Sequence, residues 1–197
     1  MRKTLAVIAL LATSGLTLTA CGGDSGDEAK SSTPSSSEFN DADVSFAQQM
    51  IPHHQQAIEM AQLAQGRASN PDVLELADDI EAAQGPEIDT LEGWLEAWGE
   101  DVPSGGMAGM DHGDMSNDDG AMSGMMDEED MNDLTDASGA AWDRMFLEMM
   151  IEHHEGAVEM AQVEVDDGAN PDAVAMANQI IRDQQAEITQ MQQLLKS

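Results

Sequence analysis

Two pairs of adjacent histidines are the residues of this chain best suited to chemistry, and each pair has methionines at helical spacing. Met50 stands three residues before His53, and Met60 stands seven residues after it. A helix would therefore place imidazoles and thioethers on one surface. Imidazole with thioether is a donor set that favours Cu(I) or Ag(I) over Mg, Ca or Mn. The candidate metal ligands are Met50, His53, His54, Met60, Met150, His153, His154 and Met160, with Met149 as a weaker candidate.

The alternative interpretation is that these histidines are buried polar residues of a methionine-containing core. Burying four imidazoles costs free energy unless each ring is hydrogen-bonded. Packing alone does not require the same His-His pair with flanking methionine twice in one chain. We therefore interpret the two pairs as metal ligands.

The histidine pairs belong to an internal repeat with an offset of 100 residues. Nine of the thirteen positions in 50–62 are identical in 150–162. In each copy, apolar residues recur at steps of three and four and predict one helix face. The chain then breaks, and Pro71 or Pro171 suits the first turn of a second helix. Since one hairpin could not cover its own apolar face, the sequence predicts an all-α four-helix bundle made of two duplicated helical hairpins.

The second predicted helix of each hairpin carries polar residues on or beside its inner face. They are Gln84, Glu87, Gln184 and Glu187. A Glu or Gln that accepts the second ring proton of a histidine would fix the orientation of a metal-ligating imidazole. Hydrogen bonding between helices without a metal explains the same residues equally well. Pro52 and Pro86 fall inside the helical patterns, where we expect them to kink or interrupt the helices.

A methionine-rich acidic insert, residues 100–137, separates the first hairpin (39–99) from the second (138–197). It is far longer than an ordinary helix connection and is rich in Gly, Ser, Asp and Asn, so we expect it to be disordered. Soft ligands in such a strand could converge on Cu(I) with lower affinity. The candidates are Met107, Met110, His112, Met115, Met122, Met125 and Met126. An acidic linker that happens to contain methionine, or an adhesive surface for a partner protein, are the alternatives.

The first 20 residues read as an export signal, with Arg2 and Lys3 before an apolar stretch and small residues after it. Leu18-Thr19-Ala20-Cys21 resembles a bacterial lipobox, which predicts a lipid anchor on Cys21. Residues 21–38 would then be an anchored flexible tether. An ordinary signal peptide or a membrane helix with an incidental Cys is the alternative. We expect an extracytoplasmic protein attached to the cell membrane.

The composition excludes several other classes of protein. Against 39 acidic residues stand 7 Lys and Arg, for a formal net charge of -32, so the chain would repel nucleic acid. A single Cys provides neither a disulfide framework nor a Cys-rich zinc site. The 16 methionines, against three Phe, three Trp and no Tyr, exceed what core packing ordinarily uses.

The block Met-Ile-Pro-His-His-x-x-Ala-Ile-x-Met-Ala, followed by Asn-Pro and Gln-x-x-Glu-Ile, resembles a ferritin-like family of domains of unknown function, number three hundred and five in its series. The resemblance covers about residues 39–99 and 138–196. It implies an exported helical bundle, with copper or silver binding and copper tolerance in some members. It also implies the same ligand block, Met50, His53, His54 and Met60 with Met150, His153, His154 and Met160.

This chain differs from the family pattern in two ways that affect which of the family's ligands can be assigned to it. Glu152 replaces the proline of the block, and Gly156 stands where the first copy has Gln56, which predicts sites of different affinity. No glutamate lies three residues before His53 or His153, so a carboxylate-bridged di-iron site is disfavoured.

The sequence thus predicts a lipid-anchored copper-binding protein that buffers Cu(I), confers copper tolerance or exchanges copper with a donor or acceptor protein, and homo-oligomers are compatible with it. We expect no enzyme activity, because no set of nucleophile, base and oxyanion stabiliser is evident. One alternative is an iron or manganese oxidoreductase in which glutamates join the histidines: Glu59, Glu87, Glu159 and Glu187. The other is a non-catalytic lipoprotein scaffold that docks a partner protein.

Overall fold

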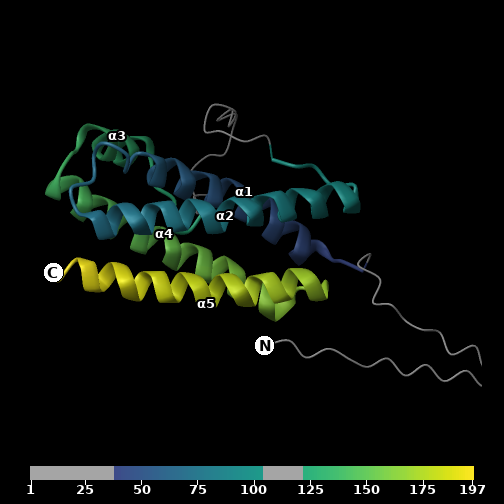
Figure 1. Cartoon of the computed structure of the whole chain (residues 1–197). Helices are drawn as coiled ribbons and strands as arrows, with labels where there is room; N and C mark the ends of the chain where they lie inside the picture. Colours follow the sequence, from purple (N-terminus) through teal and green to yellow (C-terminus); the bar gives the residue numbers. More distant parts are fainter. Residues whose placement is uncertain (1–37, 104–121) are drawn as a thin grey trace, which may run out of the picture. The chain divides into compact units, whose positions relative to one another are not determined.

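The computed structural model describes residues 38–103 and 122–197. Within these ranges the chain is entirely helical and contains no strand. The helices are α1 (Asp41–Gln62), α2 (Pro71–Trp98), α3 (Glu128–Asp136), α4 (Ala140–Asp167) and α5 (Pro171–Leu194) (Figure 1). The predicted all-α class is confirmed. The predicted signal sequence, Cys21 and residues up to 37 lie outside the described residues, as do Met107, Met110, His112 and Met115.

Each copy of the repeat forms one helical hairpin, α1 with α2 and α4 with α5 (Figure 1). The second helix of each hairpin begins at its predicted proline, and the asparagine before it is the N-cap. The Asn70 side chain accepts a hydrogen bond from the backbone N–H of Asp72, and Asn170 does the same for Asp172. These caps satisfy backbone donors that the first helical turn leaves free. None of the described helices is long and apolar enough to cross a membrane.

The two hairpins meet through α1 and α4, which cross in opposite directions. One buried apolar cluster joins the first half of α1, including Phe46 and Met50, to the second half of α4, including Ala157. The other cluster joins Met60 of α1 to Phe146 in the first half of α4. The midpoint between these clusters is where both His-His pairs lie.

A reciprocal pair of aspartates holds each hairpin to the loop of the other. The Asp43 carboxylate, near the start of α1, accepts hydrogen bonds from the backbone N–H groups of Ala169 (3.2 Å) and Asn170 (2.8 Å). Asp143, its counterpart in α4, accepts from the backbone of Ser69 (2.9 Å) and Asn70 (3.0 Å). Burial raises the pKa of the Asp43 carboxyl group, but hydrogen bonds from the backbone N–H groups of Asn40 and Asn170 lower it. The hydrogen bonds outweigh burial, so the pKa lies below its usual value.

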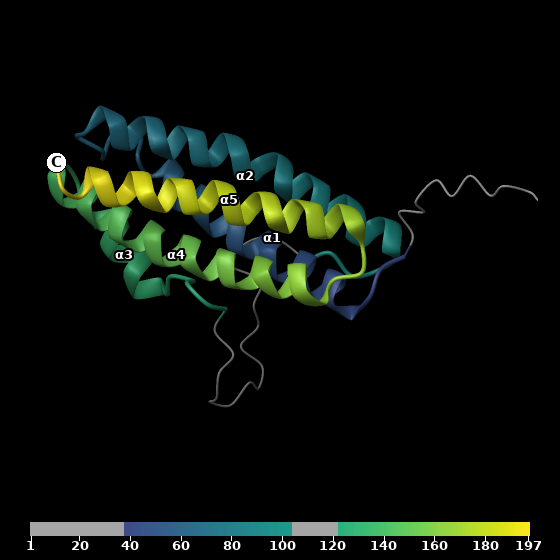
Figure 2. The ribbon, with the colours of Figure 1, turned by 90° about the horizontal axis from the view of Figure 1, so that it is seen from below.

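The predicted disorder of the insert is wrong for its last part, residues 122–137. This part contains α3, which lies beside α4 (Figure 2). Met126 and Met131 are buried, with 6% and 8% of their surface exposed, and pack in one cluster with Leu134 and Trp142. An apolar surface on α4 supplies the burial that the segment cannot provide for itself, so tertiary packing overrides its polar composition.

The sequence predicts that the two internal prolines kink or interrupt their helices, whereas the structure shows no interruption. Both α1 and α2 continue as helices through Pro52 and Pro86. Each proline removes one backbone donor, but the buried faces on both sides of it keep the helix in register. The apolar periodicity, which continues across each proline, therefore predicts these two helices better than the positions of the prolines do.

Candidate metal centre

The two histidine pairs meet at the crossing of α1 and α4. The ring centroids of His53 and His153 are 3.8 Å apart, with an angle of 42° between the ring planes. The His153 and His154 centroids are 6.3 Å apart. All four side chains are fully buried. The sequence left open whether the pairs form one site or two, and the structure brings them together as one histidine cluster: His53, His54, His153 and His154.

Three of the four rings have a hydrogen-bond acceptor at Nε2. Nε2 of His54 lies 2.8 Å from a carboxylate oxygen of Glu87, and Nε2 of His154 lies 2.6 Å from one of Glu187. Nε2 of His53 lies 3.1 Å from the backbone carbonyl oxygen of Ser123. A neutral imidazole that donates through Nε2 keeps its lone pair on Nδ1.

The Nδ1 atoms of the four histidines are buried and have no hydrogen-bond partner among the described residues. In His153, Nε2 is without a partner there as well. Burial, assisted by the nearby His54, lowers the pKa of His53 to about 3. Burial also holds the pKa of His153 well below its usual value, and His53 adds to this effect. Both rings are therefore neutral at neutral pH, the state that a metal requires.

The polar residues of α2 and α5 that were predicted to contact the histidines differ in their contacts: within the described ranges, the two glutamates reach a histidine, and the two glutamines do not. Glu87 and Glu187 hydrogen-bond to histidines, as a residue orienting a ligand would. Gln84 is buried, and neither atom of its side-chain amide has a partner in the described part of the chain; Oε1 of Gln184 is in the same condition. These amides add unsatisfied polar atoms to the interior. Unsatisfied buried groups are costly, so their presence points to a site that a ligand completes.

The predicted methionine ligands lie on both sides of the histidine cluster. Met50 and Met160 belong to one apolar cluster, and Met60 and Met150 belong to the other. Met50, Met60 and Met150 are fully buried, whereas Met160 is partly exposed. The weaker candidates Met122, Met125 and Met149 are also partly exposed, and Met126 lies in the core.

No group of three or more His, Cys, Asp or Glu side chains within 38–103 and 122–197 is arranged to hold a metal ion. Of the four glutamates of the iron or manganese alternative, Glu59 and Glu159 are exposed, and Glu87 and Glu187 accept hydrogen bonds from Nε2 of His54 and His154. The interior holds four buried imidazoles, and the buried Met50, Met60 and Met150 lie in the apolar clusters on either side of them. Imidazole and thioether suit a soft cation.

Sequence reasoning did not find the Ser123 carbonyl or the role of Gln56. The Gln56 side chain donates to the carbonyl oxygen of Met126 and accepts from its N–H, both at 2.8 Å. The replacement of Gln56 by Gly156 in the second copy was the available signal. In the sequence this replacement predicts sites of different affinity, whereas in the structure Gly156 leaves space for the backbone of Ser123.

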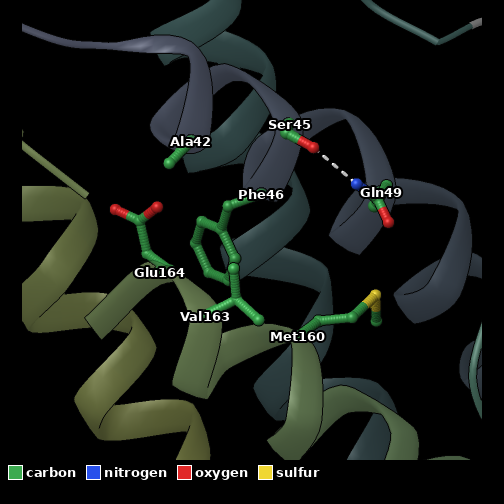
Figure 3. Close-up of a pocket in the computed structure, with 7 residues that line it drawn as sticks. All are labelled: Ala42, Ser45, Phe46, Gln49, Met160, Val163 and Glu164. Atoms are coloured by element: carbon green, nitrogen blue, oxygen red, sulfur yellow. Dashed lines mark hydrogen bonds between the residues drawn. The ribbon is translucent and has the colours of Figure 1, made fainter. Parts of the chain in front are cut away.

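A separate pocket of about 140 Å³ lies between the start of α1 and the end of α4 (Figure 3). It is lined by Ala42, Ser45, Phe46, Gln49, Met160, Val163 and Glu164. The equivalent surface in the other half of the repeat includes Trp142 and Phe146, and α3 packs in that cluster. The pocket therefore lies where the first copy has Ala42 in place of Trp142 and where no described helix corresponds to α3.

Comparisons with known proteins agree with this architecture. Residues 43–195 match the family described as Domain of unknown function (DUF305). A DUF305 protein from Streptomyces coelicolor is 31% identical, with a TM-score of 0.68 over 79% of this chain and 91% of that one. A DUF305 fragment from Deinococcus radiodurans is 30% identical, with a TM-score of 0.68 over 80% and 97%.

A third solved structure is CopM in its Cu(I)-bound form. It is 32% identical, with a TM-score of 0.63 over 78% of this chain and 95% of CopM. Cu(II)-bound, Ag-bound and apo forms of CopM match as well. No curated protein matches the chain.

Proposed function

Since this chain belongs to the DUF305 family, we propose that it is an extracytoplasmic, lipid-anchored protein that binds Cu(I), and Ag(I) in the same way, at the histidine cluster. CopM, a relative of similar fold, has been crystallised with Cu(I), Cu(II) and Ag. In this chain, copper is the cargo and the proposed role is buffering, tolerance or transfer. The proposal includes no catalytic activity.

The observation that carries the proposal is the set of unpartnered Nδ1 atoms inside the bundle. Three of these rings donate through Nε2 to an oxygen acceptor, which leaves their Nδ1 lone pairs free in the interior. Buried polar atoms without partners are costly in a protein that has no ligand to place there. A cation that accepts these lone pairs would remove the cost.

The metal is proposed to be soft because of the thioethers around the cluster. Met50, Met60 and Met150 are fully buried next to the crossing of α1 and α4. Imidazole and thioether donors without carboxylates favour Cu(I) over Mg, Ca and Mn. The exposure of Glu59 and Glu159 disfavours the alternative iron or manganese oxidoreductase.

The anchor and the methionine-rich insert belong to the proposal as sequence-based predictions. The lipobox at Cys21 supports attachment to the outer face of the membrane, and the Streptomyces relative is described as secreted. Met107, Met110, His112 and Met115 are proposed as a lower-affinity collector. A net charge of -32 would attract cations to the surface of the protein.

The test is a titration of the full chain in detergent with Cu(I), against a chromophoric competing chelator, in parallel with Zn(II) and Fe(II). The variant carries Ala at His53, His54, His153 and His154, and circular dichroism confirms that it is still helical. The matched control is Asp79→Ala, an exposed residue of α2 that belongs to no proposed site. Tight Cu(I) binding that is lost in the quadruple variant and retained in the control supports the proposal. A wild-type protein without preference for Cu(I) contradicts it and leaves the scaffold alternative.

A further inference from the structure

Four residues of the insert that come just before α3, Ser123 to Met126, form a strap that lies directly on the histidine cluster. The carbonyl oxygen of Ser123 accepts the hydrogen bond from Nε2 of His53. At the other end of the strap, the backbone of Met126 exchanges two hydrogen bonds with Gln56. The Ser123 hydroxyl donates to a carboxylate oxygen of Glu159 at 2.7 Å. The strap is thus attached to both α1 and α4.

The strap packs against α4 so closely that only glycine fits on either side. A Cβ atom at Gly156 would overlap the carbonyl group of Ser123. A Cβ atom at Gly124 would meet the backbone of Glu152 and His153, and Gly124 has a φ of 79°, in the left-handed region. The contact therefore depends on a backbone approach above His153 that any side chain would prevent.

The strap also makes the two halves of the repeat unequal. Where the second copy has Gly156 and room for the strap, the first copy has Gln56, whose amide holds the strap down. His53 gains an acceptor at Nε2 from this arrangement, whereas the equivalent atom of His153 has none in the described ranges. The departure from exact repetition coincides with the place where the strap docks.

All four histidines are fully buried with the strap in place, so an ion from solvent has to displace something to reach them. The elements around the cluster are long helices held by continuous backbone hydrogen bonds. The strap is instead held by the four hydrogen bonds described above, which involve His53, Gln56 and Glu159, and by the buried side chain of Met126 at its last residue. Segments with few such bonds are the ones that open by local fluctuation.

We propose that the strap Ser123–Met126 is the displaceable cover of the histidine cluster, and that its release from Gln56 and Gly156 controls how fast metal enters and leaves. This inference rests on the proposed function and concerns the regulation of that site. Opening breaks the bond from His53 to Ser123 and exposes the cluster beside Gly156. Closing restores that bond and leaves Nδ1 of His53 as the donor available to the metal.

The test uses Gly156→Ala in the full chain in detergent, since the added Cβ overlaps the strap backbone at Ser123 and Gly124 and pushes the strap away. Gln56→Ala is the second variant and removes the other attachment. Gly93→Ala in α2 is the matched control, because its added Cβ meets no atom within 4 Å. The first measurement is the rate at which Cu(I) passes from the chromophoric chelator to the protein. The second is hydrogen exchange at the Met126 amide without metal.

We expect both strap variants to exchange the Met126 amide faster and to take up Cu(I) about tenfold faster than the wild type, which corresponds to about 1.4 kcal/mol. The control should match the wild type in both measurements. Faster amide exchange with an unchanged rate of Cu(I) uptake overturns the proposal that the strap is the cover, while the proposed function stands. A wild-type chain that takes up no Cu(I) overturns the proposed function and the cover with it.

Discussion

The rings of His53 and His153 are in contact, with centroids 3.8 Å apart, although the two residues are 100 positions apart in the sequence. Each occupies the same position in its copy of the repeat, and the antiparallel crossing of α1 and α4 brings the two positions together. Two imidazolium rings at this distance would repel each other in a buried site. The contact is therefore compatible with neutral rings, in agreement with the lowered pKa of both residues.

The contact predicts that the two histidines act at one metal site. His53→Ala and His153→Ala should each lower the Cu(I) affinity, and the double variant should lose little more than either single variant. The expected coupling is about 0.5–3 kcal/mol, the range for residues that are in contact or share a partner. Chelator competition with the four proteins of the cycle measures it. Losses that add in full would instead indicate two independent sites.

The carboxylates that face His54 and His154 should tune the affinity without being ligands. Glu87→Gln and Glu187→Gln replace the charged acceptor of an Nε2–H group by a neutral amide. Loss of such a partner typically lowers metal affinity about tenfold or more, so we expect this for each variant. Asp89→Asn, an exposed change on the same helix as Glu87, is the matched control. Equal affinities for Glu87→Gln and the control would contradict the prediction.

Leucine substitutions separate the role of methionine as a ligand from its role in packing. Met50→Leu and Met150→Leu preserve most of the buried volume, so the free energy of unfolding should fall by less than about 1.5 kcal/mol. The Cu(I) affinity should fall while folding is retained, because leucine has no thioether. Met191→Leu is the control, since Met191 is equally buried but is not a predicted ligand. Chelator titration and thermal unfolding of the same samples decide the question, and unchanged Cu(I) affinity would assign these methionines to the core alone.

Glu164 makes the stability of the fold depend on pH. Burial, with Asp43 beside it, raises the pKa of this carboxyl group from 4.5 to about 8. Between these values the folded state holds a proton that the unfolded chain has released, so the contribution of Glu164 to stability falls as the pH rises through this window. Glu164→Gln should be more stable than the wild type by about 2 kcal/mol near pH 8.5 and equal to it near pH 4.

Urea unfolding of both proteins across the pH range measures this difference. Glu155→Gln provides the control, because Glu155 is an exposed glutamate on the same helix. A stability difference for Glu164→Gln that does not change with pH would contradict the raised pKa.

The reciprocal aspartates should contribute to stability but not to metal affinity. Asp143→Ala leaves the backbone N–H groups of Ser69 and Asn70 without their acceptor. Unsatisfied partners of this kind cost about 1–3 kcal/mol, and we expect a decrease of that size in the free energy of unfolding. Chemical denaturation compares the variant with Asp79→Asn, an exposed change. Wild-type stability in Asp143→Ala would show that the contact does not hold the hairpins together.

Several features were determined by the sequence itself. The three-and-four periodicity predicted the helices, and the Asn-Pro pairs placed the starts of α2 and α5 correctly. The repeat predicted that both halves share one plan. Glu87 and Glu187 were singled out as candidate partners of histidine from their positions on the inner face alone. These features are local, since they depend on helix geometry and capping within one hairpin.

Only the tertiary structure decided that the two His-His pairs form one cluster. Periodicity identifies the face that a helix buries, but it does not specify which turn of a neighbouring helix packs against that face. The crossing of α1 over α4 depends on packing across both hairpins and on aspartates that bind the opposite loop. The Ser123 carbonyl had no sequence signal, because every residue carries a backbone carbonyl and its position depends on the fold. The same is true of α3 and the residues before it, where Met126 and Met131 are buried only because α4 offers them an apolar surface.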